Sequence, residues 1–324
     1  MNANRIIGGN HGLPVEANGK TVKKLSKNTL VNARSCLYAI MAHLNNPPIW
    51  MPSYLCESLL HEDYNVKFYD VDRSLTIDES FLTEIKPSEA VLVIDYFGFT
   101  QDRKIYERIK EKKCFSIEDA SQSLLSDRDT TPDFTIYSLT KCLGLPDGGM
   151  IEARNSSFDV EVLPSPNNFV ESATNFRRKR AEFDRGENDD WYSFYMAHKK
   201  LAVPIGPYAM SDLSKNLYES YDQPEIISRT RENYAHLQKH LDPIKQLVEG
   251  IAPIGFPILH ENRDTLLDLL IENNIYPPIH WRLRQVPKSF LDSHWFSERQ
   301  ITLPCDHRYN LEDMERIIKC VLHS

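Results

Sequence analysis

A nearly continuous apolar run at 91–96, VLVIDY, constrains the fold of this chain more than any other segment. Its residues do not alternate between apolar and polar, so we expect a strand that is buried on both faces. Such strands occur in parallel sheets that helices cover on both sides. Other elements are expected around it, with strands at 66–72, 114–117, 134–137 and 150–153 and helices at 32–44 and 101–113. Strands that alternate with helices predict right-handed crossovers, and hence an α/β fold with a mostly parallel sheet.

The pattern changes in the middle of the chain and restarts near its end. Residues 155–200 are polar and are expected to be irregular, with a basic cluster at 177–180. A solvated helix face is one interpretation of that cluster, and contact with a substrate phosphate is the other. Later elements are expected as helices at 229–241 and 264–274, a strand at 255–259 and a last helix capped by Asn310. The sequence therefore predicts a large domain at 1–225 and a smaller α/β domain at 226–324.

Composition excludes several classes of protein. With 324 residues, 41% of them hydrophobic, the chain can bury a large core. Its net charge of −8 argues against nucleic acid as a partner. The six cysteines show no CxxC and no metal-ligand spacing, so we expect reduced thiols and no metal site. No signal segment and no membrane-spanning run is visible, and a cytoplasmic location is predicted.

Charged side chains follow two of the expected strands. Asp119 ends the strand in CFSIED, and Lys141 follows the strand in FTIYSLTK. Ligands of parallel sheets bind beyond the carboxyl ends of the strands, where both residues fall. A lysine that can form a Schiff base and a carboxylate that can hold a pyridine nitrogen protonated are what pyridoxal 5'-phosphate (PLP) requires. The pair predicts a PLP site.

Each residue of the pair also has an ordinary explanation. Lys141 could be a surface lysine, and Asp119 could cap a helix, because Ala, Ser and Gln follow it. Ser138 and Lys141 together form the Ser-x-x-Lys pattern of penicillin-recognising enzymes, but the companion Ser-Asp-Asn and Lys-Thr-Gly elements are missing. Ser138 is instead expected to donate to the cofactor phosphate.

A second phosphate contact is expected at the start of the first long helix. Ala33, Arg34 and Ser35 open that helix, where backbone N–H groups and a hydroxyl form an anion site. Helix capping by Asn32 explains the same residues.

The order of these motifs resembles that of the DegT/DnrJ/EryC1/StrS family of PLP-dependent sugar aminotransferases, which have the type I fold of PLP enzymes. The resemblance extends from about residue 28 to the C-terminus. The matching blocks are Asn32-Ala33-Arg34-Ser35, Pro52-Ser53-Tyr54, Phe68-Tyr69-Asp70-Val71-Asp72, Asp95-Tyr96-Phe97-Gly98, Glu118-Asp119-Ala120-Ser121-Gln122-Ser123, Ser138-x-x-Lys141, Asp147-Gly148-Gly149, Arg229-x-Arg231-x-Asn233-Tyr234, Leu303-Pro304 and Leu311-Glu312-Asp313.

The resemblance implies a role for several of these residues. Lys141 would carry the Schiff base, Asp119 would pair with the pyridine nitrogen, and Gln122 would bond the ring hydroxyl. Ser138, Arg34 and Ser35 would hold the phosphate. The implied enzyme is a homodimer with shared active sites. It would move an amino group from an amino acid, usually glutamate, to a nucleotide-linked keto sugar in polysaccharide or secondary-metabolite biosynthesis.

Some positions depart from the family pattern. The family usually has a glycine and a hydroxyl residue at the Ala33 and Arg34 positions, so Arg34 is expected to contact phosphate by its charge. The aromatic residue that stacks on the ring falls near Cys56, and Tyr54 is the expected substitute. Segment 206–211 lacks the Asn-Arg pair that the neighbouring subunit contributes in the family, so the acceptor need not be a typical nucleotide sugar.

In the C-terminal half, His280 and Arg282 are candidate substrate ligands, because Arg282 could bind a carboxylate or phosphate with two hydrogen bonds. A packed tryptophan at 281 beside a surface arginine is the alternative. Two other functions stay open: a different PLP reaction, such as decarboxylation or elimination, and a binding protein that retains the fold without catalysis. Glutamate-dependent amino transfer without release of carbon dioxide separates them.

Overall fold

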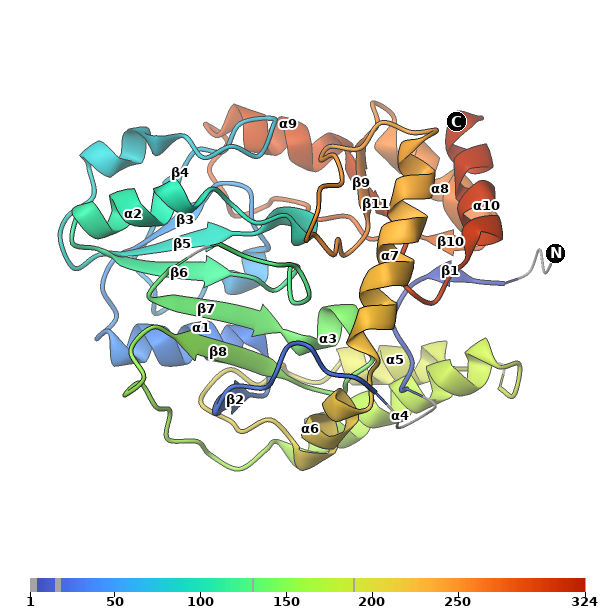
Figure 1. Cartoon of the computed structure of the whole chain (residues 1–324), viewed down its shortest axis with the longest axis horizontal. Coiled ribbons are helices and arrows are strands. Elements are labelled where there is room, and N and C mark those ends of the chain that lie inside the picture. Colours follow the sequence, from blue (N-terminus) through green and yellow to red (C-terminus); the bar gives the residue numbers. More distant parts are fainter. Residues whose placement is uncertain (1–4, 15–18, 130, 189, 324) are drawn as a thin grey trace.

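The computed structural model describes residues 5–14, 19–129, 131–188 and 190–323, so residues 1–4, 15–18, 130, 189 and 324 of the two predicted domains lie outside it. Its centre is a seven-stranded sheet in the order β2-β8-β7-β6-β5-β3-β4 (Figure 1). The strands of this sheet are β2 (Asn28–Leu30), β3 (Ile49–Pro52), β4 (Val66–Tyr69), β5 (Ala90–Ile94), β6 (Phe115–Asp119), β7 (Phe134–Ser138) and β8 (Gly149–Ala153). Within the sheet β8 runs opposite to both of its neighbours, and the other pairs are parallel. The predicted mixed α/β fold with a mostly parallel sheet is confirmed.

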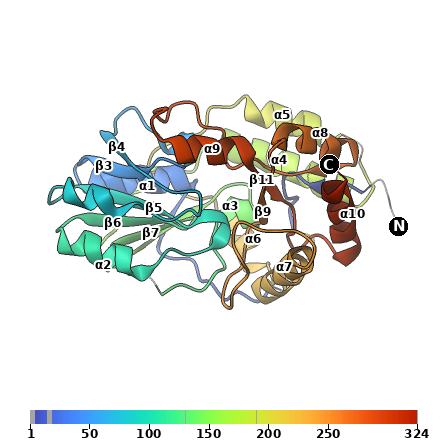
Figure 2. The same ribbon diagram turned by 90° about the horizontal axis from the view of Figure 1, so that it is seen from above.

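Two helices cover opposite faces of the sheet. Helix α1 (Ala33–His43) packs on β7 and β8, and α2 (Arg103–Glu111) packs on β6 from the other side (Figures 1 and 2). Helix α2 buries Ile105 and Ile109, one turn apart, and leaves its charged residues in water. Because both faces are covered, all five residues of β5 are buried, as the apolar run predicts.

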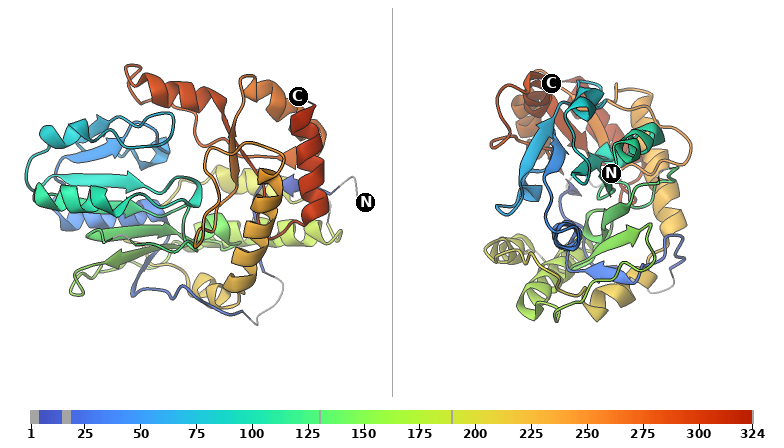
Figure 3. Two further views of the ribbon diagram at one scale, coloured as in Figure 1. Left: turned by 45° about the horizontal axis from the view of Figure 1, so that its top comes forward. Right: turned by 90° about the vertical axis from the view of Figure 1, so that its left-hand side faces the viewer.

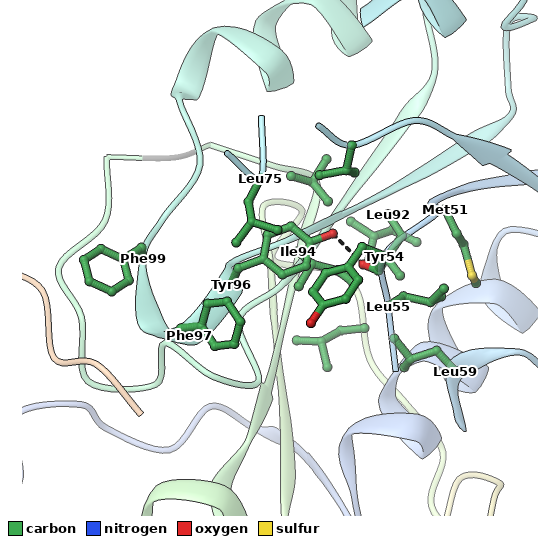
Figure 4. Close-up of a cluster of buried hydrophobic side chains, with 14 of the residues drawn as sticks. Met51, Tyr54, Leu55, Leu59, Leu75, Leu92, Ile94, Tyr96, Phe97 and Phe99 are labelled. Carbon is green, nitrogen blue, oxygen red and sulfur yellow. Dashed lines mark hydrogen bonds between the residues drawn. The ribbon is translucent and has the colours of Figure 1, made fainter. Parts of the chain in front are cut away.

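The hydrophobic core continues past the carboxyl ends of β3 and β5. Figure 4 shows Tyr54 and Tyr96 there among aliphatic side chains, including Leu55 and Leu92. The Tyr96 hydroxyl donates to the backbone carbonyl of Tyr54 at 2.6 Å, which satisfies a polar group inside this core.

The later elements lie beside the carboxyl edge of the sheet, toward which the arrows of β5, β6 and β7 point (Figures 1 and 3). They are α6 (Asp212–Glu219), α7 (Gln223–Gln238), β9 (Phe256–Leu259), α8 (Arg263–Glu272), β10 (Ile275–Tyr276), α9 (Leu291–Arg299), β11 (Gln300–Leu303) and α10 (Leu311–Leu322). Asn310 caps α10 in a capping box with Asp313, which confirms the predicted cap. Three short 3₁₀ helices, η1 (Glu57–Leu59), η2 (Glu79–Thr83) and η3 (Tyr96–Gly98), complete the connections.

The N-terminal segment joins these later elements. Strand β1 (Ile7–Gly8) pairs in parallel with β10, so residues from the two ends of the sequence share one small sheet. A Cβ on Gly12 would lie 2.7 Å from the backbone nitrogen of Ala181, and this close approach holds the segment against helix α4 (Asn167–Asp184). Helix α7 runs through the predicted boundary at 225, and the division into two domains stays a prediction.

The expectation that residues 155–200 are irregular is wrong, because α4 and α5 (Tyr192–Lys199) occupy most of them. The solvated-face interpretation of the basic cluster holds for Arg178, which is exposed, but is wrong for Arg177 and Arg180, which are 7% and 1% exposed. Their guanidinium groups donate to the backbone carbonyls of His11 and Gly8, which makes burial tolerable.

The expectation of reduced thiols is confirmed, because all six cysteines are free. Within the described residues, every helix is too short or too polar to cross a lipid bilayer.

Candidate functional site

A cavity of about 200 Å³ lies at the carboxyl ends of β5, β6 and β7, and we call it the strand-end cavity. It brings together Asp119 and Lys141, the two residues on which the sequence prediction depends. Its lining residues come from these strand ends, from the start of α1 and from two later loops: Asn32, Ala33, Arg34, Cys56, Ser58, Leu59, Ile94, Asp119, Ser121, Gln122, Ser138, Thr140, Lys141 and Trp281.

Asp119 and Lys141 reach this cavity from neighbouring parallel strands. Asp119 is the last residue of β6 and is 7% exposed, and its Oδ1 accepts the Ser121 N–H at 2.9 Å. Lys141 lies in α3 (Leu139–Cys142), the single turn that follows β7. Among the described residues, neither side chain forms an ion pair. A carboxylate and an amine are therefore both available to a ligand.

The two ends of the Gln122 side-chain amide have different surroundings. Its Oε1 accepts the backbone N–H of Phe97 at 2.7 Å. Its Nε2 is buried and has no hydrogen-bond partner among the described residues. A buried donor without a partner is costly, and an acceptor on a ligand would satisfy it.

Among the described residues, Arg34 at the start of α1 is the one arginine that lines this cavity. Arg34 lines the wall, its guanidinium forms no ion pair with any described residue, and burial lowers its pKa. Ser35 does not line the cavity: it is fully buried, its N–H donates to Asn32 Oδ1 at 2.9 Å and its hydroxyl lies 3.4 Å from the Pro204 carbonyl. The capping explanation of Asn32 is thus observed, and Arg34 remains the charged group that can hold a phosphate.

Gly149 explains why β8 can lie against the helix start. A Cβ at this position would lie 2.6 Å from the Ala33 nitrogen. The preceding Asp147 accepts the N–H of Ser211 at 2.8 Å and the hydroxyls of Ser211 and Ser214. Burial raises the pKa of Asp147, and these three donors lower it. The Asp-Gly-Gly block therefore anchors segment 206–211 beside α1.

The aromatic residue of the cavity is Trp281. Tyr54, the expected stacking residue, is 1% exposed and packs against Trp281 with ring centroids 5.4 Å apart. It lies behind the wall, whereas Trp281 and Cys56 are on it. Trp281 lies more than a hundred residues after Lys141 in the sequence. No local sequence pattern indicates that it lines this cavity.

A second cavity of about 470 Å³ shares Thr140 and Lys141 with the first, and we call it the N-terminal cavity because residues 8–11 form part of its wall. His280 lines it, and burial together with the nearby Lys141 ammonium lowers the His280 pKa to about 3. Arg282 does not line either cavity. It is half exposed and its Nη2 donates to Asp264 at 3.0 Å.

Glu118, next to Asp119, points to a buried charge cluster instead of the cavity, because side chains alternate along a strand. Arg128 lies between two buried carboxylates, with Nε 3.5 Å from Glu118 Oε2 and Nη2 3.4 Å from Asp95 Oδ2. Burial and the Glu118 charge raise the pKa of Asp95 to about 8. A protonated Asp95 leaves one negative and one positive charge in this cluster.

One further cluster was not expected from the sequence. His236 and His240 on α7 and Glu315 on α10 each place one possible ligand atom within 4.8 Å of the others. His236 Nε2 lies 2.6 Å from Glu315 Oε1, so a hydrogen bond between the two helices accounts for this contact.

No known family model and no curated protein matches the chain. Solved structures do. PseC of Helicobacter pylori, an aminotransferase involved in the biosynthesis of pseudoaminic acid, is 15% identical with a TM-score of 0.69 over 98% of each chain. The PLP form of a putative sugar aminotransferase from Streptococcus pneumoniae, Spr1654, is 13% identical with a TM-score of 0.66 over 97% of each chain. A DegT DnrJ EryC1 StrS aminotransferase from Brucella abortus is 17% identical with a TM-score of 0.63, over 91% of this chain and 85% of its own. The resemblance expected from the motifs is confirmed at the level of the fold.

Proposed function

We propose that this protein is a PLP-dependent aminotransferase that moves an amino group from an amino acid to a keto sugar. The observation that carries the proposal is that Asp119 and Lys141 line one cavity at the carboxyl ends of β6 and β7. The fold shared with solved aminotransferases supports it.

The groups on the cavity wall fit PLP at each of its polar ends. Asp119 offers a carboxylate to the pyridine nitrogen, and Gln122 offers the unpartnered Nε2 to the ring hydroxyl. Arg34 and the Ser138 hydroxyl would hold the phosphate, and Trp281 would contact the ring. Ser35 would act indirectly, because its bonds to Asn32 and Pro204 fix the start of the helix.

When bound, PLP supplies an aldehyde that condenses with amines and a ring that accepts electrons from the substrate carbon. The residues of this chain then position the reactants and move protons. The Nζ of Lys141 would hold the PLP aldehyde, and once the donor amine has displaced it the released neutral amine would take the proton from the amino-bearing carbon of the donor. Asp119 would pair with the ring nitrogen, and Trp281 would contact the ring.

We also propose that the donor is glutamate, that the acceptor is a nucleotide-linked keto sugar and that the enzyme acts in the cytoplasm as a homodimer. The names of solved sugar aminotransferases support a sugar as the acceptor. Helix α5 supports the dimer, because it buries none of its residues while Tyr192, Phe194 and Met196 are 58%, 37% and 37% exposed. A second copy that covers this surface would remove it from water.

Borohydride reduction tests the proposal without depending on turnover. Protein incubated with PLP, reduced and digested is expected to carry a pyridoxyl group on the peptide that contains Lys141. The Lys141→Ala variant should lose the label. Lys215→Arg, which changes an exposed lysine that pairs with Asp212, should keep it.

Glutamate is then added to the unreduced protein to follow conversion of the cofactor to its amino form. Conversion without release of carbon dioxide supports transamination. Label on a different lysine, or no label at all, contradicts the proposed cofactor site.

A further inference from the structure

Lys141 is reached from two sides, because it lines both the strand-end cavity and the N-terminal cavity. If PLP occupies the first, as proposed above, a reactant that meets Lys141 extends into the second. The wall of the N-terminal cavity includes backbone from residues 8–11 and the side chains of Arg177, His280, Asp306 and Arg308. What that reactant carries can be inferred from the charges on this wall.

Arg177 differs from the other arginines that are buried to a similar degree. Arg180 pairs with Asp184 at 2.8 Å and Arg263 pairs with Asp264 at 2.7 Å. Arg177 is 7% exposed and forms no ion pair with any described residue. Burial lowers its pKa to about 10, with the Arg308 charge adding to the effect. A buried cation without a counter-ion is costly, so proteins rarely retain one without a partner or ligand.

The remaining groups on the wall do not neutralise Arg177. Asp306 is already paired with Arg308, whose Nε and Nη2 donate to its two oxygens at 2.7 and 2.9 Å. Burial lowers the pKa values of His11 and His280, so both imidazoles are neutral near pH 7. Tyr195 and Tyr276 line the same wall and carry no carboxylate. Among the described residues of this wall, Arg177 is therefore the charge left uncompensated once Lys141 is joined to PLP.

The guanidinium of Arg177 also has an unused edge. Its Nη1 donates to the His11 carbonyl at 2.8 Å, which fixes the orientation of the planar group. Its Nε is buried and has no partner among the described residues. Nε and Nη2 together form the edge that can donate to both oxygens of a carboxylate.

We infer that Arg177 is a specificity-determining residue that binds a carboxylate of one of the two reactants in the N-terminal cavity. A single guanidinium matches a monoanion, whereas a diphosphate group would need more cations than this wall supplies. The carboxylate belongs either to the amino donor or to the acceptor, and the two sources are separated below.

Calorimetric titration with glutarate, a dicarboxylate that carries no amine, tests the inference on the PLP-loaded protein. Arg177→Met is expected to weaken glutarate binding by about 10- to 100-fold, because a charge-assisted bidentate contact is lost. Arg177→Lys keeps the positive charge but cannot donate two parallel hydrogen bonds, so an intermediate loss of glutarate affinity is expected. Arg178→Met is the matched control, since Arg178 is the exposed neighbour on the same helix and its Nη2 donates to Asn175 Oδ1. Borohydride labelling of Lys141 should be unchanged in all three variants.

Glutarate binding to Arg177→Met and Arg177→Lys within twofold of wild type would overturn the inference. The source of the carboxylate follows from single-turnover amino transfer by glutamate. A raised half-saturation concentration of glutamate in Arg177→Met assigns the carboxylate to the donor, and an unchanged one, with weaker glutarate binding, assigns it to the acceptor. If Lys141 takes no label in the wild type, the proposed cofactor site fails. The glutarate titration still tests Arg177 in that case, because it needs no turnover.

Discussion

The side-chain amide of Gln122 accepts the backbone N–H of Phe97 at 2.7 Å, and this bond determines which end of Gln122 a ligand meets. A backbone N–H can only donate, so the oxygen of Gln122 must face Phe97. The unpartnered Nε2 is then the group that Gln122 can offer in the strand-end cavity. The orientation of this amide follows from a hydrogen bond outside the cavity.

Gln122→Glu is therefore expected to weaken PLP binding by about tenfold. Glutamate keeps the size of the side chain and still accepts from Phe97, but it replaces the donor by an acceptor. Titration of the apoprotein with PLP, followed by absorbance, measures the change. Gln101→Glu is the control, because Gln101 donates to the Ile94 carbonyl at 2.9 Å without lining the cavity. Equal affinities in the two variants would contradict the role assigned to Gln122.

Asp119→Asn is expected to reduce amino transfer by about 100-fold or more while Lys141 still takes the borohydride label. Asparagine can keep the contact with Ser121, so the fold is preserved and the charge alone is lost. Loss of one partner of a buried ion pair costs about 3 kcal/mol or more, which corresponds to this factor. Single-turnover rates with glutamate measure it.

Asp133→Asn is the control for that variant, because Asp133 accepts from Ser116 near the opposite end of β6. A rate for Asp119→Asn equal to that of Asp133→Asn would remove Asp119 from the proposed site.

The Asp95 carboxyl makes stability depend on pH. Its pKa is raised to about 8 in the folded chain, mainly by burial and by Glu118, against about 4 when unfolded. Between these values the folded state binds the proton and the unfolded state does not. The free energy of unfolding should therefore fall as pH rises from about 4 to 8. Asp95→Asn, which cannot ionise, should flatten this fall, and thermal unfolding at a series of pH values measures both curves. A curve equally steep in the variant would assign the dependence to other groups.

Tyr192→Glu is expected to weaken the proposed dimer by at least about tenfold. Tyr192 is 58% exposed on α5, so a charge there leaves the monomer fold intact but would be buried in an interface that covers this helix. Sedimentation velocity over a range of concentrations measures the association. Leu291→Glu is the control, because Leu291 is 72% exposed on α9. A monomeric wild-type protein, or equal association of both variants, would count against α5 as the interface.

The parts of the fold that could be predicted are those that depend on neighbouring residues. The apolar run of β5 and the spacing of Ile105 and Ile109 reflect local burial, so both elements were found with small errors at their ends. The polar residues after β6 and β7 were expected to meet because parallel strands present their carboxyl ends at one edge. Asp119 and Lys141 do line one cavity.

What the sequence did not reveal depends on contacts between distant segments. Strand β3 ends in Pro52 and gave no strand pattern, although four parallel pairs to β4 hold it. The sequence predicts that Arg177 is solvated, whereas in the fold it donates to the backbone carbonyl of His11. Every residue has such a carbonyl, so the sequence does not show which one will accept this bond. Trp281 replaces Tyr54 on the cavity wall because the loop after β10 folds over the strand ends.

The pairing of β1 with β10 has a consequence for how the protein is made. Residues 7 and 8 are synthesised long before their strand partners, Ile275 and Tyr276. Until β10 has been made, β1 and the residues after it that line the N-terminal cavity have no strand to pair with. The sheet that carries Asp119 and Lys141 can assemble during synthesis, whereas closure of the cavity beside it must follow as a late step with a large loop to close.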